Sequence, residues 1–315
     1  MGGFYNIEEF DRFMVYTLDN KYTFYHINLK DTEEYYEELF NYFFDENKLL
    51  AYAENKSHLK FSPTKKNFVT LYKHLFEYID EYYDEIDINI IDEEVKKIIL
   101  DEYETTEEKE NALKIRTDKK GKIGEYIFTC ILKEFFKFDC IIPKVHMSTS
   151  RNMSIYGIDA LFYSSKNNML LFGESKLTNS LTNGVSLIKE SLKDYEKSIS
   201  DEFIVTLSKR ILKDELNKFS EIYRDFCEVS LNIKDFISKA NITQIGIPIF
   251  ITHGTEQEID KIMKKLSNIE EKDLLGVKTV YYFISLPIIN KQKFSAVFTK
   301  KIKERRDEYE SESIN

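Results

Sequence analysis

The chain has 315 residues, of which 42% are apolar and 32% are charged, and its formal net charge at pH 7 is −10. A chain of this length is expected to form one large domain or two moderate ones. No apolar run approaches the roughly 18–20 residues of a membrane span, and the acidic, polar start is unlike a secretory leader, so a soluble, cytoplasmic protein is expected. Cys130, Cys140 and Cys227 lack zinc-ligand spacing and predict no disulfide framework.

The charge is unevenly distributed along the chain. Residues 1–110 carry 27 acidic and 12 basic side chains, whereas residues 111–315 carry 28 acidic and 33 basic ones. Because phosphate groups respond to the local potential, a nucleic acid is expected to bind the back portion. The reversal falls in a charged stretch at 101–121, where we place a domain boundary. Residues 1–110 are then an acidic N-terminal lobe for partner docking or regulation, and residues 111–315 form a second domain.

The N-terminal lobe is predicted to be α-rich with a short β-hairpin. Aromatic and β-branched residues predict two strands flanking Asp19 and Asn20, which supply the turn. Apolar residues recur at helical spacing over 31–50 and again over 68–83, which predicts two amphipathic helices. Their many aromatic side chains are expected to pack in a core.

The second domain is predicted to begin with a helix over 120–138, where apolar residues recur at spacings of three and four. The elements expected after it are a strand at 139–146, two strands within 156–176 with a polar turn at 164–168, helical segments at 187–195 and 203–226, a strand at 245–252, a helix at 256–267, a strand at 279–288 and a charged terminal helix or tail at 291–310. This order predicts an α/β core with a mixed sheet flanked by helices.

The most informative segment lies between residues 156 and 176. Asp159 precedes one apolar strand, and the next apolar strand ends in Glu174, Ser175 and Lys176. Because residues two apart in a strand point to the same face, Glu174 and Lys176 are expected to project together. Asp159 is expected at the neighbouring strand end, and Glu125 would add a third carboxylate if helix 120–138 packs beside the strand pair.

Carboxylates gathered with a lysine suggest a divalent-metal site that hydrolyses a phosphodiester. Mg²⁺, or Mn²⁺ in its place, is held by carboxylates together with phosphate oxygens. The expected metal ligands are Asp159, Glu174 and Glu125, while Lys176 would assist the attacking water and lower the cost of negative charge in the transition state. The structural alternative also stays open, because acids at strand ends are common as solvated turn residues.

The pattern resembles the PD-(D/E)xK nuclease superfamily, in which a restriction-endonuclease-like core of order αβββαβ carries an Asp on one strand and Glu-x-Lys on the next. Asp159, Glu174 and Lys176 match that motif, although Gly-Ile-Asp stands in place of Pro-Asp. Many members also carry a Glu on the first core helix, which Glu125 matches. The resemblance implies an Mg²⁺-dependent DNA endonuclease.

More narrowly, residues 121–183 are similar to the HamA family, the nuclease subunits of bacterial Hachiman anti-phage systems. The similarity rests on Gly-Lys-Ile-Gly-Glu at 121–125, Tyr-Gly-Ile-Asp-Ala at 156–160 and Phe-Gly-Glu-Ser-Lys at 172–176. It implies a superfamily 2 helicase partner, HamB-like, that restrains and activates the nuclease. The chain itself lacks the GxxxxGK[ST] phosphate loop of such a motor.

Several other residues near the motifs are candidates for binding or for structure. Six basic residues are expected to contact phosphates without reading base sequence, or else to be solvated surface charges: Lys120, Lys122, Lys144, Arg151, Lys189 and Lys193. For His146 and His253, which end predicted strands, a structural or exposed role is favoured.

Two alternatives to the nuclease effector stay open. One is a non-catalytic subunit that keeps a nuclease-like fold and binds DNA and a helicase. The other is a restriction endonuclease or junction resolvase, which a defined cut site or a preference for branched DNA would favour.

Overall fold

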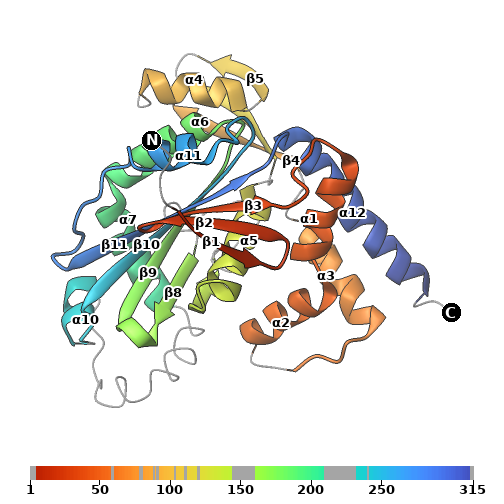
Figure 1. The fold of residues 1–315 in the computed structure, drawn as a ribbon, viewed down its shortest axis with the longest axis horizontal. Helices are drawn as coiled ribbons and strands as arrows, with labels where there is room; N and C mark the ends of the chain where they lie inside the picture. The colour runs from red at the N-terminus through yellow and green to blue at the C-terminus, as the bar shows by residue number, and fades with distance from the viewer. Residues whose placement is uncertain are drawn as a thin grey trace.

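The computed structural model describes residues 5–57, 60–77, 81–87, 89, 92–102, 104–109, 112–118, 121–143, 160–208, 232–239 and 241–312. Within these residues, eight strands form one sheet that runs through the molecule (Figure 1). In spatial order the strands are β1 (Asn6–Phe10), β2 (Phe13–Leu18), β3 (Lys21–His26), β11 (Lys278–Pro287), β10 (Gln244–His253), β9 (Met169–Leu177), β8 (Ala160–Ser164) and β7 (Asp139–Pro143).

The sheet is parallel in its centre and antiparallel at both ends. Strands β3, β11, β10 and β9 run parallel to one another. The predicted hairpin is present as β2 and β3, and Asp19 takes a φ of 52° in its turn, a conformation that Asp tolerates better than most residues. At the other end, β8 pairs antiparallel with both β9 and β7. The predicted α/β class and mixed sheet are therefore confirmed.

The central strands are apolar almost throughout because helices cover both of their faces. Along β10, Ile245, Ile247, Ile249 and Ile251 belong to one buried cluster, whereas Phe250 belongs to the other and stacks on Phe128 with ring centroids 5.4 Å apart. The sheet thus divides the interior into two cores.

One core is built by helices from both ends of the chain. It lies between the sheet and α1 (Glu33–Phe43), α2 (Glu46–Ser57), α3 (Lys65–Glu77), α5 (Gly121–Glu134) and α12 (Lys291–Glu312). On α12, Phe294, Phe298 and Ile302 recur every four residues and are at most 1% exposed, so one stripe of this otherwise charged helix is buried.

The other core lies on the opposite face of the sheet. The helices that cover it are α6 (Leu181–Lys193), α7 (Tyr195–Ser208), α10 (Ile233–Lys239) and α11 (Ile259–Leu266). Among the described helices, none combines the length and the apolar character that crossing a membrane requires.

A second, smaller sheet forms where the sequence predicted a helix end and a charged boundary. Its strands, in spatial order, are β4 (Glu81–Asp87), β6 (Ala112–Asp118) and β5 (Glu104–Lys109), and α4 (Glu93–Glu102) lies between β4 and β5 in the chain. The prediction of helix up to residue 83 is therefore wrong over β4, and 101–121 is not a plain linker. Strands β4 and β5 are rich in charged residues, so they lack the alternation from which strands are recognised.

The charge reversal near residue 110 does not separate two sheets. Strand β3 pairs with β11, so the N-terminal hairpin continues the sheet formed by the C-terminal portion. Tyr35 of α1 also donates a hydrogen bond to the Pro287 carbonyl at 3.2 Å. The N-terminal hairpin and the C-terminal strands therefore belong to one sheet, and the domain boundary at 110/111 stays a prediction.

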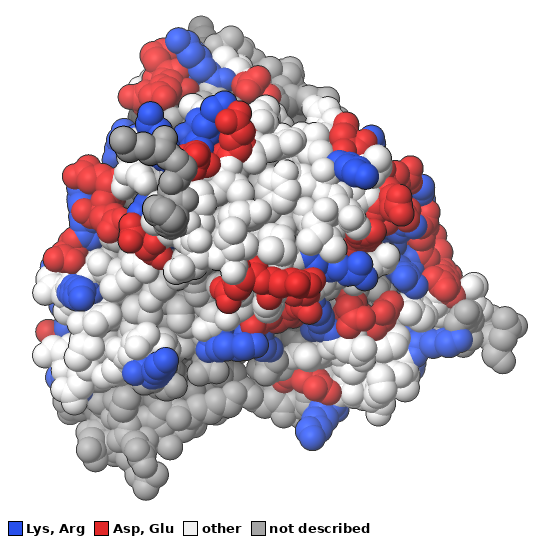
Figure 2. Space-filling model, in the orientation of Figure 1, with Lys and Arg blue, Asp and Glu red and all other residues white. Residues whose placement is uncertain are grey.

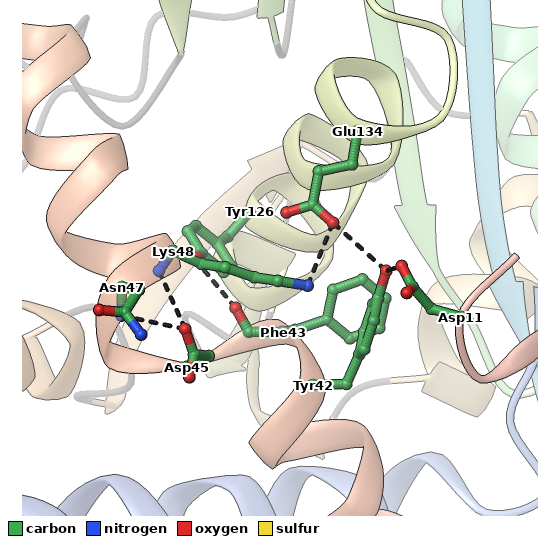
Figure 3. A network of polar contacts seen from close by, with 8 residues as sticks. All are labelled: Asp11, Tyr42, Phe43, Asp45, Asn47, Lys48, Tyr126 and Glu134. Atoms are coloured by element: carbon green, nitrogen blue, oxygen red, sulfur yellow. Dashed lines mark hydrogen bonds and ion pairs between the residues drawn. The ribbon is translucent and has the colours of Figure 1, made fainter.

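A polar network joins the N-terminal segment to α5 (Figure 3). Tyr42 donates to Asp11 at 3.0 Å and to Glu134 at 3.3 Å, and the Lys48 ammonium lies 3.1 Å from the Glu134 carboxylate. Lys48 also lies 3.5 Å from the centroid of the Tyr42 ring. Burial, together with the charges of Glu134 and Asp11, raises the pKa of Tyr42, so this hydroxyl stays a donor.

Candidate active site at the end of strand β9

The buried carboxylate of Glu174 meets the ammonium of Lys176 near the carboxyl end of β9. Lys176 Nζ lies 2.6 Å from Glu174 Oε1, and the side chains are 29% and 3% exposed, respectively. The two side chains project together, as the two-residue period of a strand predicts. A carboxylate this deeply buried is rare unless it is paired, so the pair needs a structural or a chemical reason.

The register of β9 shows which face the pair occupies. Glu174 is opposite Ile249 of β10, and Lys176 is opposite Ile251. Both isoleucines belong to the core beneath α6 and α11, as do Leu170 and Phe172 earlier in β9. Because paired residues in a sheet share a face, Glu174 and Lys176 project toward the side covered by α6.

Short polar contacts connect β9 to α6 directly after the pair. The Thr178 hydroxyl donates to the carbonyl oxygens of Ser180 and Thr252 at 2.8 and 3.1 Å. Ser180 then caps α6 by accepting a hydrogen bond from the Asn183 backbone at 3.2 Å. Gly184 lets the helix approach β10 closely, because a Cβ there would overlap the Cγ2 methyl group of Ile251. These contacts hold the start of α6 over the ends of the central strands.

Glu125 lies on α5, which covers the opposite face of the sheet. A Cβ added to Gly124 would lie 3.6 Å from Leu177 Cβ, so the first turns of α5 reach the end of β9. However, α5 packs in the core that contains Met169 and Leu171, the residues of β9 that alternate with Leu170 and Phe172. The helix therefore packs beside the strand pair as expected, and the convergence of Glu125 with Glu174 stays a prediction.

Asp159 lies outside the described residues. It directly precedes Ala160, which is paired with Gly173, the residue before Glu174. Within the described part of the chain, no three His, Cys, Asp or Glu side chains gather closely enough to hold a metal ion. The donor type nevertheless fits Mg²⁺, because the Glu174 carboxylate is a hard oxygen ligand at a strand end.

Three of the six predicted phosphate-binding residues lie on described helices, and three do not. Lys120, Lys144 and Arg151, like His146, lie outside the described residues, and Lys122 lies in the first turn of α5. Lys189 and Lys193 are exposed on α6, where Lys193 forms an ion pair with Glu190. That hydrogen-bonded pairing is the main reason why the pKa of Lys193 is raised, and Asp92, directly before α4, is among the lesser causes.

His253 ends β10 as a buried residue, which agrees with a structural role and not with an exposed one. It is 1% exposed, and no described residue forms a hydrogen bond with either of its ring nitrogens. Burial, with a smaller effect from Lys265, lowers its pKa to about 3, so the ring is neutral near neutral pH.

Sequence reasoning missed the contact between α4 and α6. Asn183 donates to Asp101 at 3.3 Å, and the Ser186 hydroxyl donates to Glu94 at 3.2 Å. The acid excess of residues 1–110 was the available signal, but it did not say which surface these acids face.

Comparison with known proteins places the chain in a family. No curated protein matches it. The family model of HamA matches residues 37–302, which is most of the 315-residue chain. The chain belongs to the HamA family.

Proposed function

We propose that this chain is an Mg²⁺-dependent deoxyribonuclease that acts as the effector of an anti-phage defence complex. The observation that carries the proposal is the buried Glu174 carboxylate, 2.6 Å from the Lys176 ammonium, at the end of a central strand in a HamA-family chain. The HamA family is linked to anti-phage defence. A helicase partner of superfamily 2, HamB-like, would restrain the nuclease and activate it.

The order of elements supports a restriction-endonuclease-like core. From α5 the chain passes through β7, β8 and β9, then α6, and later returns to the sheet as β10. Strands β7, β8 and β9 are antiparallel to their neighbours in the chain, whereas β10 is parallel to β9. Apart from α7 and α10, which lie between α6 and β10 in the chain, this order matches the αβββαβ core that the superfamily resemblance implies, and it supports the proposal.

Each candidate residue has a separate role in the proposed reaction. Asp159 and Glu174 would hold Mg²⁺, and Glu125 would complete or orient the set from α5. When bound, the ion would make a water molecule more acidic and offset charge on the phosphate. Lys176 would turn its ammonium from Glu174 toward the attacking water or the scissile phosphate, where the negative charge grows in the transition state.

The most direct test is DNA cleavage by the chain together with its helicase partner and ATP. We expect linear or supercoiled DNA to be cut with Mg²⁺, and expect EDTA or Glu174→Gln to abolish the cutting. Glu270→Gln is the matched control, because it also neutralises one carboxylate, one that is 76% exposed. DNA that is bound but never cut by the wild-type complex would instead support the non-catalytic alternative.

A further inference from the structure

Helix α4 lies beside α6, the helix that follows the Glu174–Lys176 pair (Figure 1). The two helices run in opposite directions. Asp101, near the end of α4, contacts Asn183 in the first turn of α6, whereas Asp92, directly before α4, acts electrostatically on Lys193 in the last turn. Figure 2 shows acidic and basic side chains side by side at the top of the view, where Figure 1 places these helices.

The contacts fall on the side of α6 that bears its exposed lysines. Ser186 follows Asn183 by three residues, and Lys189 follows Ser186 by three. Lys193 lies seven residues, about two helical turns, after Ser186, so all four residues lie along one stripe of the helix. Lys189 and Lys193 are the two predicted phosphate contacts that lie on α6. The carboxylates on and directly before α4 therefore lie beside the surface of α6 that a nucleic-acid backbone would contact.

The acids of α4 are held in place by an apolar face. Val95, Ile98 and Ile99 are each at most 9% exposed, whereas Asp92, Glu94 and Asp101 are exposed. The helix is thus anchored on one side and presents negative charge on the other. Each exposed polar contact is weak by itself, but the fixed charges act together on any phosphate within a Debye length.

We propose that α4 is a built-in electrostatic competitor of nucleic acid, which lowers the affinity of the α6 surface for a phosphate backbone and so limits access to the Glu174–Lys176 site. This inference rests on the proposed function for its biological meaning. It assigns a definite segment and a definite surface to the regulatory role expected of residues 1–110. Activation would require a partner or a high local DNA concentration to overcome the repulsion.

The test measures binding of the full chain to a short fluorescent DNA duplex by anisotropy, at low salt and in EDTA so that no cutting occurs. The variant is Asp92→Asn/Glu94→Gln/Asp101→Asn, which removes three charges but keeps side-chain size. Asp92 accepts a hydrogen bond from the Glu94 backbone at 2.9 Å, and Asn also accepts such bonds at helix starts, so α4 should stay folded. Urea unfolding verifies this point.

The matched control is Glu304→Gln/Asp307→Asn/Glu308→Gln on α12, which changes the net charge equally. We expect the α4 variant to bind DNA about tenfold more tightly than wild type, and the control about as tightly as wild type. We also expect the gain in DNA affinity to disappear when Lys189→Gln and Lys193→Gln are added to the α4 variant, because the lysines that would contact the phosphates are then absent.

Three outcomes overturn the inference. Equal binding by the α4 variant and the control would do so, as would a gain that persists without the two lysines or an absence of DNA binding by every variant. Cleavage by the wild-type complex combined with unchanged binding by the α4 variant would remove this inference alone. A tighter α4 variant in a chain that never cuts DNA would instead contradict the proposed nuclease.

Discussion

Lys176 places its ammonium 2.6 Å from the carboxylate of Glu174, two positions earlier on the same buried strand. The pairing lets a carboxylate that is only 3% exposed keep its charge within the protein. In the proposed reaction, Lys176 would leave this pairing for the attacking water or the scissile phosphate. Two variants separate the structural use of this pair from its chemical use.

Glu174→Gln is expected to reduce cleavage without unfolding the protein. A neutral amide of the same size no longer has to keep a charge buried, so the free energy of unfolding should change by less than about 1 kcal/mol or should rise. Cleavage should fall by at least about 100-fold, the effect of losing a group that stabilises the transition state. Urea unfolding and DNA cleavage, measured on one preparation, test both parts. A loss of stability with cleavage retained would assign Glu174 a purely structural role.

Lys176→Met is expected to destabilise the chain in a way that Mg²⁺ repairs. The variant leaves the Glu174 carboxylate buried without its ammonium, which should lower the free energy of unfolding by about 1–3 kcal/mol. Added Mg²⁺ should recover part of this loss by binding the native state, but not in Glu174→Gln/Lys176→Met. The readout is the urea midpoint. Lys261→Met is the control, because its ion pair with Glu258 is exposed; an equal response to Mg²⁺ there would exclude a specific site.

The local features of the site were predictable from the sequence, whereas its surroundings were not. The period of a strand suffices to place Glu174 and Lys176 on one face. The position of α5 depends on tertiary packing, so the sequence could not show that Glu125 stands on the helix that covers the opposite face. The contact of Asp101 with Asn183 joins residues 82 positions apart, and no local pattern carries it.

The fold shows the same division. The hairpin, α5 and the central strands follow from apolar periodicity and turn chemistry. The pairing of β3 with β11 joins parts of the chain that are far apart in the sequence. The charge reversal near residue 110 gave no sign that the two portions share one hydrogen-bonded sheet. Strand β5, with the sequence ETTEEK, is stabilised by its pairing with β6 and has no apolar alternation of its own.

Glu134→Ala is expected to loosen the attachment of the N-terminal helices to α5. It removes the acceptor shared by Tyr42 and Lys48, so the free energy of unfolding should fall by about 1–3 kcal/mol. Lys133→Ala, one position earlier, is the control and should change it by less than about 0.5 kcal/mol. In a double-mutant cycle by urea unfolding, Tyr42→Phe should couple to Glu134→Ala. Strict additivity would show that the hydrogen bond contributes nothing.

Gly184→Ala is expected to push α6 away from the sheet. The new methyl group would overlap Ile251 Cγ2 and approach Thr178 Oγ1, so we expect a loss of about 1–3 kcal/mol in the free energy of unfolding. Ile251→Ala in the same chain should make room, so the double variant should be more stable than the sum of the two single effects. Gly276→Ala is a contrasting control, because that glycine has open space but a φ of 77°; Ile251→Ala should not rescue it. Equal effects of Ile251→Ala in both backgrounds would contradict the packing argument.

His253 is expected to make the native state less stable as the pH falls. Its pKa is lowered to about 3 in the folded chain, chiefly by burial, whereas an unfolded histidine titrates near its ordinary value of 6.5. Below that pH the unfolded chain takes up a proton that the native chain does not. The free energy of unfolding therefore decreases by up to about 1.4 kcal/mol for each pH unit by which the pH is lowered. Between about pH 7.5 and about pH 5, wild type should therefore lose about 2 kcal/mol more than His253→Leu.

The comparison uses urea unfolding at both pH values, because the shared carboxylates cancel between the two proteins. His253→Leu should also be at least as stable as wild type near neutral pH, since it replaces two ring nitrogens that form no hydrogen bond with any described residue. His26→Leu is the control for burial. The pKa of His26 is also lowered by burial, although Glu38 acts on it in the opposite direction. Unlike His253, His26 forms a hydrogen bond within the described residues, because its Nδ1 accepts one from the Asn28 backbone. Its removal should therefore cost stability at neutral pH. Parallel pH profiles for wild type and His253→Leu would mean that His253 is protonated in the native state, and that burial does not control its charge.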